Sequence, residues 1–248
     1  MQIKLPVDSY KGVDGSSLSE TRCDQLVAVY DLLEDMGTRK ITYLDLQEEV
    51  DRKKLFGSTD GKSAIRTFFP LLKKIDFVHY DRKGAFEANT FFTDLGKVFV
   101  LACRSLGNIT PYTPHREEIT NYFENIKKNA QREGLIRMYK NPDYKDHNIW
   151  IALRLFKELE IIHWNDFLYA LHCIDEGDSI EKAISDIKTD SAKIRRIEFL
   201  KDNGTKLPTT CYTYIRSYLE EAGLIIKLSP TLSKVHGDAK TFFSQIQL

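Results

Sequence analysis

The feature that most constrains the fold is a close succession of short amphipathic segments near the start of the chain. Residues 17–36 carry apolar side chains at three- and four-residue steps, the spacing of one helix face, and Gly37 follows as a stop signal. The triplet at 41–43 predicts a short strand, and residues 44–50 predict a second helix. This succession favours a small helical domain that carries only a minor sheet.

The next segments extend this order. Residues 62–75 predict a third helix with an apolar stripe, in which Pro70 is expected to bend or break the helix. Residues 77–80 and 90–92 predict the strands of a hairpin, and Thr93 is placed to cap a fourth helix. Helix, strand, helix, helix, hairpin, helix is the winged-helix arrangement, in which three helices enclose a small core and a strand pair forms the wing.

The same pattern recurs in the second half of the chain. Residues 148–174 align with residues 25–50 as helix, short strand and short helix. Residues 218–228 align with residues 71–81 as the end of a third helix entering a strand. An insertion at 175–208 separates the second and third helices of this copy. The pattern leaves open whether the second copy is a true winged helix or a helical bundle that imitates one.

We therefore predict an α+β protein, mainly α with small β-hairpins, in which tandem winged helix-turn-helix domains are joined by a helical connector. The first domain spans 1–107, the connector 108–146 and the second domain 147–248. Prolines and asparagine-containing turns frame a charged helix in the connector, at about 116–133. Residues 241–246 predict the closing helix of the second domain.

The composition is that of a soluble globular protein. Of 248 residues, 42% are hydrophobic and 29% charged. No apolar run approaches the length of a membrane span, and the start lacks the apolar segment of a signal peptide, so we expect a cytoplasmic protein without membrane contact. The cysteines form no CxxC pair, which predicts reduced, buried thiols rather than zinc ligands or disulfides; they are Cys23, Cys103, Cys173 and Cys211.

The charge balance limits the kinds of nucleic-acid binding to expect. With 36 basic and 36 acidic residues, the net charge is zero. Non-specific coating of nucleic acid depends on neutralising phosphates, so the balance argues against it. It leaves room for a specific binder whose positive charge is gathered on one face.

The third helix of the first predicted domain is a candidate DNA-reading element, because an α-helix fits the major groove. Arg66 is expected to bond a guanine edge, while Lys62 and Ser63 at the helix start would hold a phosphate. Further candidate contacts come from the same helix and from the wing turn; they are Thr67, Lys73, Lys74, Arg82 and Lys83. The alternative is an ordinary solvated helix face followed by a turn.

The second predicted domain offers a similar but less basic set. Small hydroxyls, one aromatic ring and one arginine lie at the start of its third helix; they are Thr209, Thr210, Tyr212, Thr213 and Arg216, the last as a base reader. The basic stretch at 191–206 adds Arg195 and Arg196 as candidate phosphate contacts. The alternatives are a threonine cap, a half-buried tyrosine and a solvated charge run.

The sequence contains little that resembles a catalytic or metal-binding motif. A metal-dependent nuclease needs carboxylates and a lysine on adjacent strands around a divalent ion, and neither Asp143 nor the Asp186–Lys188 triplet lies in a strand-like context. His163, His172 and Cys173 are expected to be core or half-buried groups. Motifs for nucleotide binding and acyl transfer are missing. We predict no catalytic residue, cofactor or metal.

One stretch resembles a known family. Residues 151–188 combine a Leu-rich helix end, a strand, a Trp-x-x-Phe helix start and a Ser-Ile-Glu helix start. This order resembles the DNA-recognition half of type IIS restriction endonucleases of the Fok and Alw kind, and residues 65–99 are similar to the winged-helix subdomains with which those enzymes read their site. In that family a separate domain cuts DNA. The resemblance therefore implies a recognition module, with any nuclease activity supplied by a separate domain or subunit.

Three functions follow as hypotheses. The first is sequence-specific binding of double-stranded DNA by two winged-helix units, as the target-recognition module of a restriction-type system. The second is a protein-docking subunit of a larger chromosome-organising or defence complex, which zero net charge and the Glu220–Glu221 pair favour. The third is a small restriction-type hydrolase with a hidden active site, which the scarcity of catalytic motifs disfavours.

Overall fold

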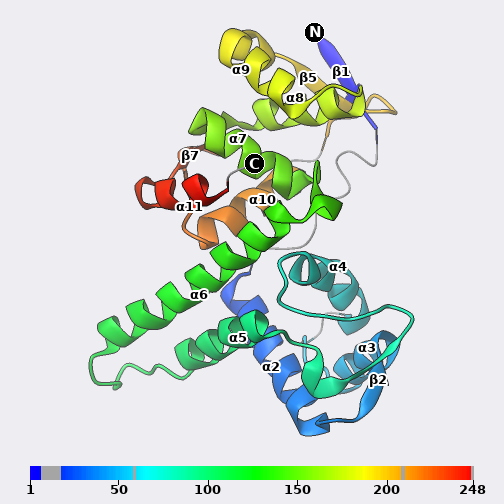
Figure 1. The fold of residues 1–248 in the computed structure, drawn as a ribbon, viewed down its shortest axis with the longest axis vertical. Helices are drawn as coiled ribbons and strands as arrows, with labels where there is room; N and C mark the ends of the chain where they lie inside the picture. The colour runs from blue at the N-terminus through cyan, green and yellow to red at the C-terminus, as the bar shows by residue number, and fades with distance from the viewer. Residues whose placement is uncertain (7–17, 58–59, 208–209, 247–248) are drawn as a thin grey trace. The chain divides into compact units, whose positions relative to one another are not determined.

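The structure is a computed structural model that describes residues 1–6, 18–57, 60–207 and 210–246. It is mostly helical with small sheets, an α+β composition (Figure 1). Contacts divide the chain into two compact units, Asp14–Met138 and Met1–Val13 with Tyr139–Leu248. Among the described helices, none has both the length and the apolar character needed to cross a bilayer.

The first unit, Asp14–Met138, begins with elements close to those predicted. They are α2 (Glu20–Met36), β2 (Lys40–Thr42), α3 (Tyr43–Arg52) and α4 (Gly61–Lys74). A capping box fixes the start of α3, where Thr42 Oγ1 accepts from the Asp45 amide at 3.2 Å and the Asp45 carboxylate accepts from the Thr42 amide at 2.7 Å. Helix α4 continues through Pro70 rather than breaking there.

The hairpin predicted after α4 is confirmed only in part: the His79 amide donates to the Phe91 carbonyl at 2.7 Å and the Thr93 amide to the Phe77 carbonyl at 3.1 Å. Residues 77–80 and 90–92 share only one bridge, Val78 to Phe92. The strand that forms is β3 (Ala85–Glu87), which pairs antiparallel with β2, and the turn η1 (Ala88–Thr90) follows it. Phe77 and Val78 are both buried, as are Phe91 and Phe92, so neighbouring side chains at the bridge serve the core, whereas His79 just beyond it is exposed.

The helix after this segment begins where the sequence predicts. Thr93 Oγ1 accepts from the Gly96 amide at 3.1 Å and caps α5 (Asp94–Gly107), while the same hydroxyl donates to the Asp76 carbonyl at 2.5 Å. Gly96 lets α5 lie against the backbone of Phe77, because a Cβ there would stand 2.8 Å from the Phe77 carbonyl carbon. The charged helix that follows, α6 (Arg116–Lys140), is longer than predicted.

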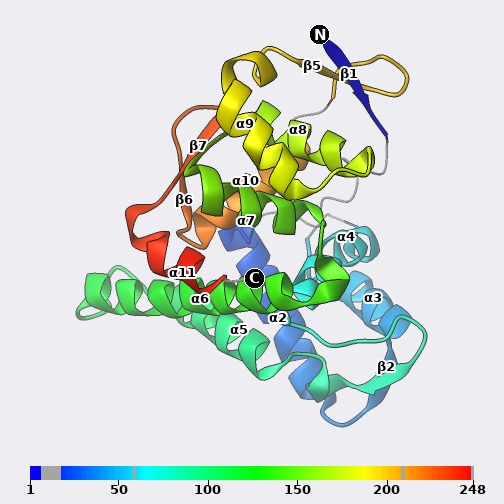
Figure 2. The same ribbon diagram turned by 45° about the horizontal axis from the view of Figure 1, so that its top comes forward.

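The second unit combines helices with two sheets (Figure 2). Its main elements are α7 (Asn148–Leu159), β4 (Ile161–His163), α8 (Trp164–Asp175), α9 (Ile180–Ile194), β5 (Glu198–Lys201), α10 (Thr210–Glu221), β6 (Ile225–Lys227), β7 (Leu232–Val235) and α11 (Lys240–Gln245). Strand β7 pairs antiparallel with both β4 and β6, which gives the order β4-β7-β6. The sequence indicated β4, β6 and α11 but not β7.

The two units differ from the predicted domains in two places. Strand β1 (Gln2–Leu5) pairs in parallel with β5 in the insertion, so the start of the chain belongs to the second unit. Residues 108–138, predicted as part of a connector, belong to the first unit. The physical reason is visible at Gly134 of α6, where a Cβ would meet the Ile75 carbonyl: the helix packs closely on the first unit.

Candidate nucleic-acid interface

Helix α4 has one apolar and one polar face. Its buried stripe fills the core of the first unit and consists of Ala64, Ile65, Phe68, Phe69, Leu71 and Leu72. Ser63, Arg66 and Thr67 lie on the opposite, exposed face, as predicted. The helix from Gly61 to Lys74 contains no carboxylate, although the Asp60 side chain caps its start by accepting from the Lys62 amide at 3.1 Å.

The exposed side chains of α4 lie against their own helix. Arg66 Nε donates to the Lys62 carbonyl at 3.3 Å, and the Thr67 hydroxyl donates to the Ser63 carbonyl at 2.9 Å. Lys62 Nζ is 4.0 Å from Glu48 Oε1, and the two side chains are 40% and 57% exposed. An ion pair as exposed as Lys62–Glu48 contributes little to stability, so the Lys62 ammonium remains available to a partner.

Lys73 has a structural role that the sequence did not indicate. Its ammonium donates to the Tyr80 carbonyl at 2.9 Å and stands 5.0 Å from the centre of the Tyr80 ring. That ring stacks on Tyr43 with centroids 4.4 Å apart, and burial raises the pKa of Tyr80. Lys73 therefore ties the segment after α4 to the helix, while the predicted contact Lys74 is half-buried.

The predicted wing turn presents two cations. Arg82 and Lys83 are both exposed, and the Asp81 carboxylate accepts from the Lys83 amide at 3.0 Å, which shapes the turn. Strand β3 follows directly. The turn thus presents positive charge even though the strands flanking it differ from those predicted.

Two predicted DNA contacts on α10 are wrong because their side chains face the core. Arg216 is 5% exposed and donates to the backbone carbonyls of Ser229 at 3.1 Å and Pro230 at 2.6 Å. Tyr212 is 2% exposed and packs against the Phe167 ring at 5.5 Å; burial raises its pKa to about 12. Arg216 follows Tyr212 by four residues and so shares its buried helix face.

Arg195 is also engaged within the protein. Its guanidinium bonds the fully buried carboxylate of Asp166, with Nη2 to Oδ2 at 3.1 Å and Nε to Oδ1 at 3.4 Å. A buried carboxylate needs such a partner, so Arg195 is not a free phosphate contact. Of the other candidates in this unit, Arg196 is exposed, Thr213 is half-buried and Thr209 lies outside the described residues.

The outward surface of the second unit is more apolar than its sequence suggested. Ile161, Lys234 and Ile226 form one row across β4, β7 and β6, and Leu228 lies beyond Ile226 on the same side. The exposed fractions of these three apolar side chains are 39–49%. On α10, Tyr214 is 43% exposed. A turn signal at Ser229–Pro230 between alternating segments was the clue to this sheet.

The histidines and cysteines are placed as expected for structural groups. His163 Nδ1 accepts from the Asn165 amide at 3.1 Å at the start of α8, and burial lowers the His163 pKa. Cys173 is buried and His172 half-buried. Within the part of the chain that the structure describes, no three His, Cys, Asp or Glu side chains gather as metal ligands.

Neither a protein-family model nor a curated protein nor a solved structure matches this chain.

Proposed function

We propose that the first unit is a winged-helix domain that binds double-stranded DNA through α4, as a target-recognition module. The observation that carries the proposal is the polarity of α4, whose exposed face presents Ser63, Arg66 and Thr67 on a helix without carboxylates. Such a face suits the major groove, where arginine reads guanine and hydroxyls approach base edges or phosphates. The order α2-β2-α3-α4, with β3 pairing to β2, supports the winged-helix assignment.

The turn at 81–84 extends the same surface in this proposal. Arg82 and Lys83 follow α4 by a few residues and are exposed. Cations at this place in a winged helix suit the phosphate backbone or minor groove. Arg66 would then supply base specificity, while the turn would supply sequence-independent affinity.

The second unit contributes to DNA binding less directly. The order of its elements and the β4-β7-β6 sheet support a winged helix with an insertion. However, the only cation of α10 is Arg216, which is buried, while Glu220 is exposed. A role in docking another protein is the second candidate, favoured for this unit by the exposed apolar side chains of its sheet. In a restriction-type system that protein would carry the nuclease.

Selection of bound duplexes from a randomised pool at about physiological salt tests the proposal. We expect an enriched motif of several base pairs. Arg66→Ala should relax one position by about 1–3 kcal/mol, whereas Lys83→Ala should weaken all sequences and reduce the salt slope by about 0.9. Lys128→Ala, which removes the same charge from α6, is the matched control and should leave both the motif and the slope unchanged.

Two results would contradict DNA reading by α4. One is an enriched motif whose base preference at every position is the same for Arg66→Ala as for the control variant Lys128→Ala. The other is no enriched motif at all, together with binding that disappears on modest addition of salt. The second result would leave protein docking as the better-supported function.

A further inference from the structure

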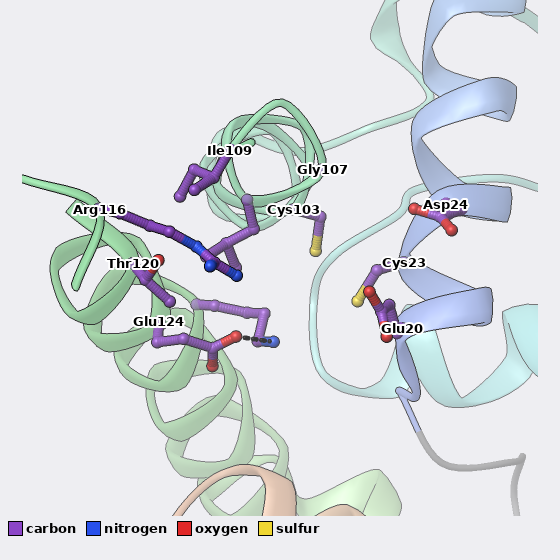
Figure 3. Close-up of a pocket in the computed structure, with 11 residues that line it drawn as sticks. Glu20, Cys23, Asp24, Cys103, Gly107, Ile109, Arg116, Thr120 and Glu124 are labelled. Atoms are coloured by element: carbon purple, nitrogen blue, oxygen red, sulfur yellow. Dashed lines mark hydrogen bonds and ion pairs between the residues drawn. The ribbon is translucent and has the colours of Figure 1, made fainter. Parts of the chain in front are cut away.

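A cavity in the first unit has a chemistry that DNA binding does not use. It lies between the start of α2, the end of α5 and the first half of α6 (Figure 3). Its volume is about 360 Å³, within the range of pockets that hold small organic molecules. All residues that line it belong to one unit, so its shape does not depend on how the two units are placed.

The wall formed by α6 is cationic. Arg116, Thr120, Glu124 and Lys127 recur at three- and four-residue steps and therefore share one face of the helix. Lys127 Nζ is 2.8 Å from Glu124 Oε1, so this half-buried pair neutralises itself. Arg116 reaches toward the cavity (Figure 3) and has no ion-pair partner among the described residues. Its charge is the one left for a ligand.

The opposite wall, formed by α2, is anionic. Glu20 and Asp24 stand one helical turn apart and both line the cavity. Within the described ranges, neither has a cation at ion-pair distance. The carboxylates of Glu20 and Asp24 would repel a ligand that carries only a negative charge. A ligand that carries only a positive charge would leave the Arg116 guanidinium without an anionic partner.

The surface between the charged walls is neutral. Cys23 and Cys103 are both buried, and their thiols face the cavity from α2 and α5 (Figure 3). The hydrogen bond with Cys23, together with burial, raises the pKa of Cys103, so its thiol stays protonated. Leu106 and Ile109 complete the apolar part of the lining.

We propose that this cavity binds a small zwitterion whose carboxylate and ammonium groups are separated by a short apolar chain. The carboxylate pairs with the Arg116 guanidinium, which can bond both of its oxygens. The ammonium group lies between Glu20 and Asp24, and the chain runs along the thiols. Such a ligand satisfies both charged walls at once, which neither a simple acid nor a simple amine does.

Calorimetric titration of the full chain with a series of ω-amino acids tests this site. Glycine, γ-aminobutyrate and ε-aminocaproate vary the separation of the two charges, while caproate and hexylamine each carry only one of them. We expect one of the longer ω-amino acids to bind at least about tenfold more tightly than both single-ended analogues. Saturable binding of caproate or hexylamine at equal strength would overturn the proposal, as would no saturable binding in the series.

Variants locate the binding at this cavity. Arg116→Gln and Glu20→Gln should each weaken the best ligand at least about tenfold, because each removes one of its two charge partners. Both side chains are exposed enough for the fold to be kept, which circular dichroism checks. Lys128→Gln removes a charge from α6 outside the cavity lining and should have no effect. Binding that survives both cavity variants would refute the assignment.

Discussion

Replacing Gly96 by alanine tests the packing that holds α5 in the first unit. In an ordinary helix this change stabilises by about 1 kcal/mol, because alanine is the better helix former. Here the new Cβ would lie 2.8 Å from the Phe77 carbonyl carbon and closer still to its oxygen. Carbon atoms pack at about 3.5–4.0 Å, so α5 must move by about 1 Å.

That movement is opposed by contacts at the start of α5. Thr93 bonds the Asp76 carbonyl, and the Phe77 and Phe99 rings pack with centroids 4.8 Å apart. Overpacking a fixed core costs about 1–3 kcal/mol, and here the obstacle is backbone, which yields least. With an overpacking cost near 3 kcal/mol and a helix gain of about 1 kcal/mol, we expect Gly96→Ala to lower the free energy of unfolding by about 2 kcal/mol.

Gly107→Ala is the matched control on the same helix. A Cβ at Gly107 meets nothing within 4 Å, so this variant should be neutral or slightly more stable. Urea denaturation followed by far-UV circular dichroism measures both variants, and the fluorescence of Trp150 and Trp164 reports on the other unit. Equal midpoints for Gly96→Ala and Gly107→Ala would refute the close-packing argument.

Two further predictions concern hydrogen bonds to carboxylates. Arg195→Ala should destabilise the second unit by on the order of 2–3 kcal/mol, because the fully buried Asp166 carboxylate would lose its cation and keep only the His163 amide as a donor. Arg196→Ala should be neutral, and urea denaturation followed by tryptophan fluorescence compares the two variants. Asp45→Ala should cost about 1 kcal/mol at neutral pH through loss of the capping box. Hydrogen bonds from Thr42 lower the pKa of Asp45 from 3.8, so the stabilisation by its carboxylate is present above pH 3.8 and is lost as the pH falls through the lowered pKa. The free energies of unfolding of wild type and Asp45→Ala should therefore converge in acid. A difference between them that stays constant across this pH range would contradict the cap.

Much of the local structure was predictable because its causes are local. Gly37 ends α2, with φ near 58°, in the left-handed region that glycine adopts without strain. Thr93 caps α5 through an amide only three residues away. Each signal lies within one or two turns of its effect, so the sequence alone contains it.

The polar side of α4 was predictable for the same reason, whereas the fate of individual cations was not. Arg66 lies opposite an apolar stripe, and its exposure follows from helical spacing. Arg216 looked equivalent, but it lies within the buried stripe of α10 and bonds carbonyls thirteen and fourteen residues away. Arg195 is bound by a carboxylate of α8. Recognising such partners requires knowing which segments meet in the folded chain.

By itself, the sequence determined most of the helices with their approximate bounds and the polar face of α4, because periodicity and capping act over a few residues. The tertiary structure decided the pairing of β1 with β5, almost two hundred residues apart, and assigned α6 mainly to the first unit. It also decided that Arg195 and Arg216 serve the fold while Arg116 lines a cavity. The physical reason is that a charged side chain either bonds a buried group of the protein or stays accessible to a ligand, and long-range packing decides which groups come within its reach.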